Sequence, residues 1–268
     1  MRQPPPFTPL TTRDQLGTVV SLPAPPRRIV SLVPSQTELL FDLGLDAEVV
    51  GVTKFCVYPR EKVRGKTVVG GTKDFRLEVI ERLQPDLILG NKEENTREGI
   101  EQLRQQYPVW VSDIATLADA LAMISTVGSL VNRPLEAGQL THDIRNAFQV
   151  LAVHTASACI RPRVAYFIWR KPYMVAGAGT FIDDMLRRAG FRNVFNSITR
   201  YPEITPEQLK AAAPRRVLLS SEPYPFSEKH VTEFRTLCPA AEIQVVDGEL
   251  FSWYGSRLLH SAAYFQTL

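Results

Sequence analysis

The sequence has few of the residues that build disulfide frameworks or metal sites. Its 3 cysteines, Cys56, Cys159 and Cys238, are odd in number and form no CxxC pair, which argues against both a disulfide-stabilised fold and a zinc knuckle. We expect these thiols to be buried structural residues. The 4 histidines are scattered, and His142 and His154 share one predicted helix but lie too far apart along its axis to bind one metal. The sequence therefore predicts no metal site.

An excess of charge of one sign and long apolar runs are also missing. The net charge is only +3, and no run of Lys or Arg exceeds two residues, so the sequence does not indicate a nucleic-acid surface. No apolar stretch approaches the roughly 18 residues of a membrane span. Residues 1–9 lack the basic, apolar and small-residue pattern of a secretion signal. We therefore expect either a cytosolic protein or one whose signal has been removed.

Familiar catalytic motifs are absent as well. The chain contains no G-x-S-x-G elbow, Walker A loop or HExxH helix. Gly177-Ala178-Gly179 lacks the third glycine of a dinucleotide-binding loop, and we expect a tight turn there, before a helix that begins at Thr180. Because no acid, base and nucleophile constellation is visible, we predict no catalytic residues and a protein that is not an enzyme.

What the chain does contain is a repeat of part of itself. The segment from Leu77 to Leu89 recurs in outline from Pro206 to Leu219, about half the chain later. In each copy a glutamate precedes a proline by seven residues, and an apolar run follows that proline. A helix that stops at proline and gives way to a buried strand is half of a β-α-β unit. The repeat predicts two similar α/β lobes, with a ligand cleft between them.

Strand and helix patterns alternate along the whole chain, which is typical of an α/β fold with parallel, helix-covered sheets. Ser35 and Glu38 fit a capping box for the first helix, and we expect Asp74 to cap the helix that ends at Pro85. A long uninterrupted helical pattern in the middle of the chain predicts a stiff connection that limits closure to a small tilt. We therefore predict an N-terminal hairpin (1–26), an N-terminal α/β lobe (27–133), a bridging helix (134–158) and a C-terminal α/β lobe (159–268).

Aromatic and small polar residues follow many of the predicted strands. In open α/β sheets these carboxyl ends of strands face the ligand crevice, and aromatic rings in loops suit a bulky, partly apolar ligand. The alternative is that they cover the sheet ends as additional core. Arg257 could donate two hydrogen bonds to a ligand, or form a surface ion pair. The predicted ligand-binding residues are Ser35, Phe55, Tyr58, Gly71, Thr72, Trp169, Tyr173, Tyr201, Phe251, Trp253, Tyr254 and Arg257.

Glu78 and Glu207 occupy matching places in the two copies of the repeat. Each falls in the first turn of its predicted helix, where a carboxylate complements the helix dipole whatever the function. Thr205-Pro206-Glu207-Gln208 also fits a capping box. Their equivalence between the lobes adds a second hypothesis, in which the two acidic side chains engage basic pockets on a symmetric partner.

These residues together resemble one protein family. The run from Arg28 to Glu38, then Tyr58-Pro59, Leu83 to Ile88, Thr205 to Leu209 and Ser256-Arg257 is similar to the substrate-binding proteins of ABC importers for cobalamin and iron-siderophores, most of all their cobalamin-binding branch. The resemblance covers nearly the whole chain after Pro26.

The resemblance implies two Rossmann-like lobes joined by one long helix, with the ligand held between them and little closure on binding. It implies that Glu78 and Glu207 dock onto arginines of the permease. It also places five of the predicted ligand residues near the cleft: Tyr58, Trp169, Tyr201, Trp253 and Arg257.

The leading hypothesis is therefore a monomeric, periplasmic binding protein without an intrinsic cofactor, which delivers a corrinoid to the transmembrane dimer of an ABC importer. A ferric siderophore or haem is the alternative ligand, because a few tyrosines and Arg257 could face an anionic chelate. A cytosolic corrinoid-handling or sensory protein on the same scaffold is the alternative class, suggested by the missing secretion signal.

Overall fold

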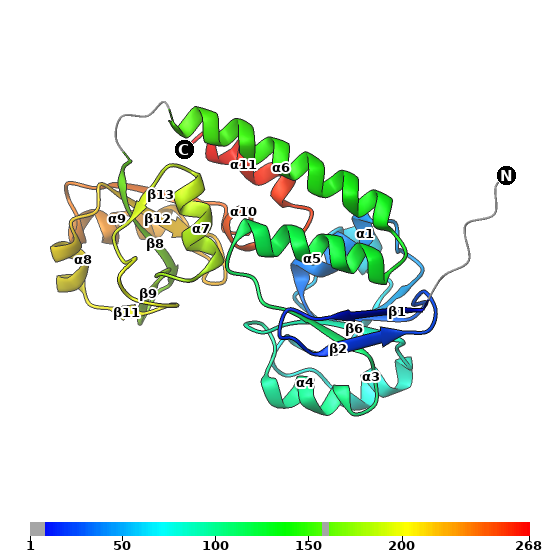
Figure 1. Cartoon of the computed structure of the whole chain (residues 1–268). Helices are drawn as coiled ribbons and strands as arrows, with labels where there is room; N and C mark the ends of the chain where they lie inside the picture. Colours follow the sequence, from blue (N-terminus) through cyan, green and yellow to red (C-terminus); the bar gives the residue numbers. More distant parts are fainter. Residues whose placement is uncertain (1–8, 157–160) are drawn as a thin grey trace. The chain divides into compact units, whose positions relative to one another are not determined.

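The computed structural model describes residues 9–156 and 161–268, which fold as two compact units (Figure 1). Of the described residues, unit 1 comprises 9–113, 118–142 and 254–257, and unit 2 comprises 114–117, 143–156, 161–253 and 258–268. The long helix α6 (Pro134–Ala156) contributes its first part to unit 1 and its remainder to unit 2. The prediction of one long helix is confirmed over residues 134–156, and the last two residues of the predicted range, 157 and 158, lie outside the described residues.

Unit 1 is built on a five-stranded sheet in the order β5-β4-β3-β6-β7, in which all neighbours are parallel. Figure 1 shows α3 and α4 on one face of this sheet and α1 on the other. The elements are β3 (Ile29–Ser31), α1 (Pro34–Asp42), β4 (Val49–Val52), α2 (Arg60–Val63), β5 (Thr67–Val68), α3 (Leu77–Leu83), β6 (Leu87–Asn91), α4 (Arg97–Arg104), β7 (Val109–Ser112) and α5 (Leu117–Leu130).

Three strands of the unit 1 sheet, β3, β6 and β7, consist mainly of apolar residues because both of their faces are covered. Every residue of β3, β6 and β7 is buried. Val30 and Ile88 of the sheet share a core cluster with Ile80 of α3 and Ile100 of α4. The predicted N-terminal hairpin is present as β1 (Leu10–Arg13) and β2 (Val19–Leu22), with Gly17 at φ 87° in its turn.

The two N-cap residues that the sequence predicted in unit 1, Ser35 and Asp74, are wrong. The N-cap of α1 is Val33, Pro34 opens the helix, and Ser35 is buried without capping it. The N-cap of α3 is Arg76 instead of Asp74. The cause is a bridge between Gly70 and Phe75, which holds Asp74 in the turn before the helix can begin. At these two positions the tertiary contacts of the folded chain, rather than the local capping pattern, determine where the helix begins.

Unit 2 has a sheet in the order β11-β9-β8-β12-β13, with β10 beside β8. Strands β8, β10, β12 and β13 are parallel, whereas β9 runs antiparallel to β8 and β11 runs antiparallel to β9. The short strands β9, β10 and β11 were not predicted. The elements are β8 (Arg163–Trp169), β9 (Tyr173–Val175), α7 (Phe181–Arg188), β10 (Arg192–Asn193), β11 (Glu203–Ile204), α8 (Pro206–Ala212), β12 (Arg216–Ser220), α9 (Glu228–Leu237), β13 (Glu242–Val246), α10 (Glu249–Ser252) and α11 (Leu258–Phe265).

Local sequence signals in unit 2 agree with the structure. Thr205 and Gln208 form the predicted capping box of α8. Gly179, at φ 72°, makes the predicted tight turn, and Thr180 then caps α7. Gly177 is required for another reason: a Cβ there would lie 2.2 Å from the Ile198 carbonyl oxygen. The GxG pattern therefore serves backbone packing.

The sequence repeat corresponds to a structural repeat. Helices α3 and α8 each have 7 residues, and each is followed by a residue in the left-handed conformation, Gln84 at φ 44° and Ala213 at φ 42°. In both copies a proline comes next, and a parallel strand follows. Both units thus contain the same helix-to-strand connection, which confirms two related α/β lobes.

Candidate functional site

The loop after β4 exposes apolar side chains at the carboxyl end of the unit 1 sheet. Phe55 is 50% exposed and Val57 is 44% exposed, whereas Cys56 between them is buried. The Cys56 Sγ accepts a hydrogen bond from Thr37 Oγ1 at 3.1 Å and contacts Thr53 Oγ1 at 3.2 Å. The side chains on either side of this buried thiol, Phe55 and Val57, are therefore exposed to solvent.

Both cysteines that the structure describes, Cys56 and Cys238, are buried and free, as predicted. Burial is the main cause that raises the pKa of the Cys56 thiol, and the hydrogen bonds to Thr37 and Thr53 offset part of the increase. The group is therefore a protonated structural thiol near neutral pH. The third cysteine, Cys159, lies outside the described residues.

The loop that contains Gly71 and Thr72 is held by two buried asparagines, Asn91 and Asn95, neither of which is in the set of predicted ligand-binding residues. Asn95 donates through Nδ2 to the Thr72 carbonyl oxygen at 2.8 Å and accepts at Oδ1 from the Asn91 amide at 2.8 Å. Asn91 in turn donates to Ser112 Oγ at 3.0 Å. The network fixes the ends of β6 and β7 against this loop. In the sequence, the signal for this network is a pair of asparagines at and just after the end of a predicted buried strand, because buried amide groups need hydrogen-bond partners.

Arg257 is engaged by a carboxylate of the protein. Its Nε donates to Glu38 Oε2 at 2.9 Å and a terminal nitrogen donates to Glu38 Oε1 at 2.6 Å. The guanidinium carbon lies 4.6 Å from the centre of the Tyr58 ring. Arg257 thus forms an ion pair, the alternative role stated for this residue, but the pair is mostly buried instead of lying on the surface. Its contact with a ligand stays a prediction. Glu38, expected in a capping box, is its partner.

Breaking this pair should lower stability. Both side chains are mostly buried, at 16% and 14% exposed, so Arg257→Ala leaves the Glu38 carboxylate without its charged partner. We expect a loss of about 2–3 kcal/mol in unfolding free energy, below the full cost for a deeply buried pair. Urea unfolding measures it. The double variant Glu38→Gln with Arg257→Met should recover part of the loss; an additive double variant would contradict the coupling.

In unit 2 the loops around β8 and β12 form an aromatic cluster. Trp169, at the end of β8, is 39% exposed, and its ring meets the Tyr224 ring edge-on at 5.6 Å. Tyr224 packs in turn against Phe226 at 4.7 Å and contacts His230 Nε2 through its hydroxyl at 3.3 Å. Tyr224 was not among the predicted site residues, although its loop was recognised as aromatic. The Trp169 ring therefore packs against a cluster of aromatic side chains on one side and remains partly exposed.

Tyr173 belongs to an ionic network beside this cluster. Its hydroxyl donates to Glu233 Oε1, and Arg170 Nε donates to Glu233 Oε2 at 2.9 Å. Burial and then the bond to Glu233 raise the pKa of Tyr173 to about 12. Burial alone would raise the pKa of Glu233, but the bonds from Arg170 and Tyr173 outweigh it and lower that pKa. Tyr173 is therefore a neutral phenol, and its hydroxyl proton is already committed to Glu233.

The segment 251–254 is less accessible than predicted. Phe251 is fully buried and packs against Tyr166 at 5.0 Å and Phe265 at 4.6 Å, so the prediction that it contacts a ligand is wrong: it is a core residue. Trp253 is buried and donates from Nε1 to Glu222 Oε1 at 3.1 Å. Tyr254 is also buried. For this segment the core alternative describes the side chains better.

The structure distributes the predicted site residues over both units. Tyr201 is half-buried, with the Arg200 guanidinium 5.8 Å from its ring centre. Unit 1 contains Ser35, Phe55, Tyr58, Gly71, Thr72, Tyr254 and Arg257, and unit 2 contains Trp169, Tyr173, Tyr201, Phe251 and Trp253.

Glu78 and Glu207 are exposed second residues of α3 and α8. Hydrogen bonds from its own backbone amide and from Thr205 lower the pKa of Glu207, so this carboxylate is ionised at neutral pH. The two glutamates therefore present equivalent acidic positions, one in each unit.

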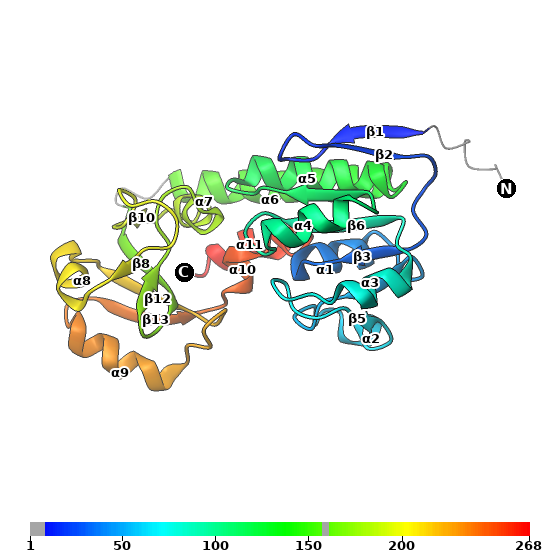
Figure 2. The same cartoon turned by 90° about the horizontal axis from the view of Figure 1, so that it is seen from below.

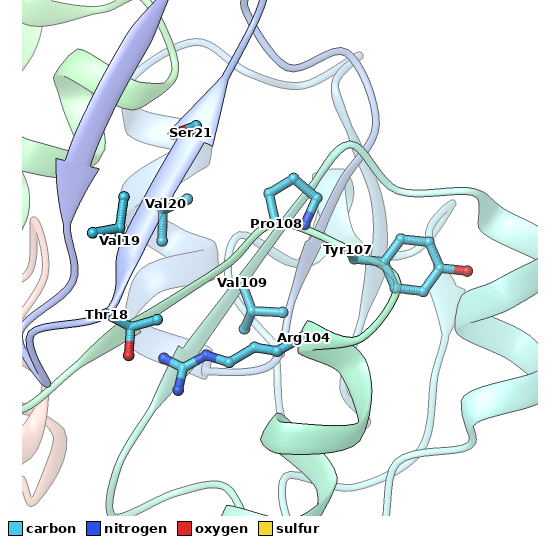
Figure 3. Close-up of a pocket in the computed structure, with 8 residues that line it drawn as sticks. All are labelled: Thr18, Val19, Val20, Ser21, Arg104, Tyr107, Pro108 and Val109. Atoms are coloured by element: carbon cyan, nitrogen blue, oxygen red, sulfur yellow. The ribbon is translucent and has the colours of Figure 1, made fainter.

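A groove of about 170 Å³ lies elsewhere in unit 1 (Figure 3). It contains none of the predicted site residues. On its wall Arg104 donates to the buried carboxylate of Asp14, which ties α4 to the N-terminal hairpin. Its lining residues are Thr18, Val19, Val20, Ser21, Arg104, Tyr107, Pro108 and Val109.

Two kinds of site have no candidate among the residues described. Within 9–156 and 161–268, no three His, Cys, Asp or Glu side chains are grouped so as to hold a metal ion. Over the same ranges no helix combines the length and the apolar character needed to cross a bilayer.

Comparison with known families decides the identity of the fold. A family model described as periplasmic binding protein matches residues 29–237. The chain belongs to this family. The resemblance inferred from the sequence is thereby confirmed.

Individual relatives agree with the family assignment. A vitamin B12-binding protein from Pectobacterium carotovorum is 26% identical over 241 residues, covering 88% of this chain and 86% of that protein. The crystal structure of the periplasmic vitamin B12-binding protein of Vibrio cholerae superposes with a TM-score of 0.78 at 23% identity, covering 91% of this chain and 96% of that one. A periplasmic haem-binding protein from Pseudomonas aeruginosa gives a TM-score of 0.78 at 23% identity, covering 90% and 92%. At these identities the two structures establish the fold alone.

Proposed function

We propose that this protein is an ABC-importer substrate-binding protein that captures a corrinoid and delivers it to a permease. The broader class, receptors for cobalamin, haem or siderophores, is supported by the family match, by the names of the relatives, and by the haem-binding and Fe3+-hydroxamate transport proteins among the structural neighbours. The choice of a corrinoid as the ligand rests mainly on one observation. The similarity to a vitamin B12-binding protein extends over 88% of the chain. The relatives are binding proteins, and we propose no catalytic step for this one.

The side chains suited to a corrinoid are the exposed rings. Phe55 follows β4 in unit 1, Trp169 is the last residue of β8 in unit 2, and both present apolar surface to solvent. Flat aromatic faces suit a large macrocycle with an apolar ring and polar edge groups. Tyr58, Tyr201 and the peptide groups of Gly71-Thr72 would supply polar contacts to the edge of such a ring.

Tryptophan fluorescence tests the ligand. The chain has 3 tryptophans, of which Trp110 is 1% exposed and serves as an internal reference, whereas Trp169 is exposed. We expect cyanocobalamin to quench the emission, and Trp169→Phe to remove a larger part of the quenching than Trp253→Phe does. Haem and a ferric hydroxamate are titrated in parallel. Quenching by either of these, with none by cobalamin, would transfer the proposal to the alternative ligand.

The permease partner is proposed from the same family relationship. One relative is named as an ABC transporter substrate-binding lipoprotein of Bacillus subtilis, and a receptor in such a system meets its permease outside the cytoplasm. Glu78 and Glu207 are the proposed docking groups because their helices are equivalent in the two units. We accordingly propose an extracytoplasmic location and a monomeric receptor.

A further inference from the structure

Exposed arginines gather at one end of the unit 2 sheet, where its parallel strands begin. Arg163 is the first residue of β8, Arg192 is the first residue of β10, and Arg215 immediately precedes β12. Arg161 lies two residues before β8, and all four side chains are exposed. Figure 2 shows β10, β8 and β12 together in this unit, with α8 beside them. The amino ends of these parallel strands therefore carry a basic edge, which we call the arginine edge (Arg161, Arg163, Arg192 and Arg215).

The strand register brings these arginines side by side. Arg192 and Arg163 are direct partners in the β10–β8 ladder. The amide of Arg215 donates to the Arg163 carbonyl oxygen at 2.8 Å, which places Arg215 next to Arg163 on the other side. Neighbouring strands are about 4.8 Å apart, and directly opposed residues project from the same face of a sheet. Like charges in such positions repel one another.

The repulsion is only partly balanced inside the protein. Arg163 donates to the carbonyl oxygen of Ala212 at 2.6 Å, and the neighbouring Arg216 pairs with Glu242 at 3.0 Å. For Arg161, Arg192 and Arg215 the described part of the chain supplies no side-chain hydrogen bond and no ion pair. The three positive charges of Arg161, Arg192 and Arg215 equal the net charge of the whole protein, which is +3. Such a concentration calls for an anionic partner.

The position of the arginine edge indicates which anion. It lies at the amino ends of the strands, at the other end of the sheet from Trp169 and Tyr224, so it does not serve the proposed ligand loops. It adjoins α8 directly, because Ala212, the acceptor of Arg163, is the last residue of that helix. The first turn of α8 carries Glu207, and a helix of this length spans about 10 Å. The basic edge therefore continues the proposed permease-docking helix.

We infer that the arginine edge contacts anionic phospholipid headgroups when the protein docks on its permease. Guanidinium groups bind phosphate through two parallel hydrogen bonds, and each basic residue near an anionic membrane surface adds to the attraction. The inference rests on the proposed docking role, since that role places α8 and its surroundings at a membrane. Removing the arginines should weaken membrane association and leave corrinoid affinity unchanged.

The test is co-sedimentation of the whole chain with lipid vesicles. We expect binding to phosphatidylcholine vesicles that contain phosphatidylglycerol, no binding to pure phosphatidylcholine, and a decline as salt is raised. The triple variant Arg161→Gln, Arg192→Gln, Arg215→Gln should bind the anionic vesicles about 100-fold more weakly, from three basic residues near the surface. Because these three side chains are exposed, their replacement should not affect folding; circular dichroism checks this.

A matched control removes the same charge elsewhere. Arg60→Gln, Arg64→Gln and Lys229→Gln replace three exposed cations that do not belong to the arginine edge, and this variant should keep wild-type vesicle binding. The inference is wrong if the wild-type protein does not bind anionic vesicles, or if the control loses as much binding as the triple variant. It is also wrong if inorganic phosphate or a DNA duplex, added at constant ionic strength, displaces the vesicles completely. Cobalamin titration of each variant separates the two proposals: if cobalamin binds but vesicles do not, only the lipid inference fails.

Discussion

Reversing both docking glutamates, Glu78→Arg with Glu207→Arg, is expected to abolish ligand uptake and to leave ligand affinity unchanged. Each glutamate is the exposed second residue of a 7-residue helix, in matching positions of the two units. If they engage basic pockets on a symmetric permease, the double reversal converts two attractions into two repulsions, and like charges brought together at an interface cost several kcal/mol. Uptake of labelled cobalamin by cells with the cognate permease, beside cobalamin titration of the purified variant, provides the measurement.

The chain offers a closely matched control for this experiment. Glu98 and Glu228 are also exposed glutamates in first turns, of α4 in unit 1 and α9 in unit 2. Glu98→Arg with Glu228→Arg therefore makes the same change in net charge and the same loss of helix-dipole stabilisation. We expect this control to transport normally. If uptake survives the reversal of Glu78 and Glu207, these residues do not dock the permease, and the repeat reflects only the shared fold of the two units.

The second large effect is expected at Asp184 of α7, where one buried carboxylate serves three donors. Its Oδ2 accepts from the Leu117 amide at 2.9 Å and from Arg188 Nε at 2.6 Å, and its Oδ1 accepts from Arg187. Asp184→Ala leaves a buried amide and a partly buried guanidinium without their acceptor. We expect a loss of about 3 kcal/mol in unfolding free energy, measured by urea unfolding. Asp42→Ala, at an exposed helical aspartate, should change it by less than about 0.5 kcal/mol.

The same carboxylate predicts a dependence of stability on acid. Burial alone would raise the pKa of Asp184, but the bonds from Arg188 and the Leu117 amide outweigh burial and lower it. The unfolded-state value is about 3.9. Its ionised form therefore stabilises the fold above that pH, and the contribution is lost as the pH falls through the lower folded-state pKa. The stability difference between wild type and Asp184→Asn should shrink over this acidic range; a constant difference would contradict the ionic role.

The sequence predicted most of the fold because the signals involved are local. The helix-to-strand repeat around Pro85 and Pro214 is a property of short segments. The structure shows it twice, and in both copies the residue before the proline has the left-handed conformation. Strand β8 is predicted from a buried apolar run, and the capping box of α8 from adjacent residues. Strands β9 and β11 were missed because they are short and are formed by pairing with each other and with β8.

The site could be predicted only in part, because its details depend on contacts across the sequence. The pairing of Arg257 with Glu38 joins residues that are far apart in the chain, and no local pattern distinguishes this ion pair from a ligand contact. Likewise Phe251 stands in a loop-like aromatic segment, but its ring completes a core with Tyr166 and Phe265. Burial of a loop side chain is set by tertiary packing, whereas sequence indicates only its chemical type.

Calorimetric titration of the purified, ligand-free protein with cyanocobalamin tests the central proposal most directly. A corrinoid receptor of this family should give a saturable, one-to-one signal with micromolar or tighter affinity, and Trp169→Ala should weaken it, because the exposed indole is a principal aromatic surface of unit 2. Removing one such stacking surface should cost roughly 1 kcal/mol or more of binding free energy. The absence of heat and of tryptophan quenching at high micromolar cobalamin would contradict the proposal.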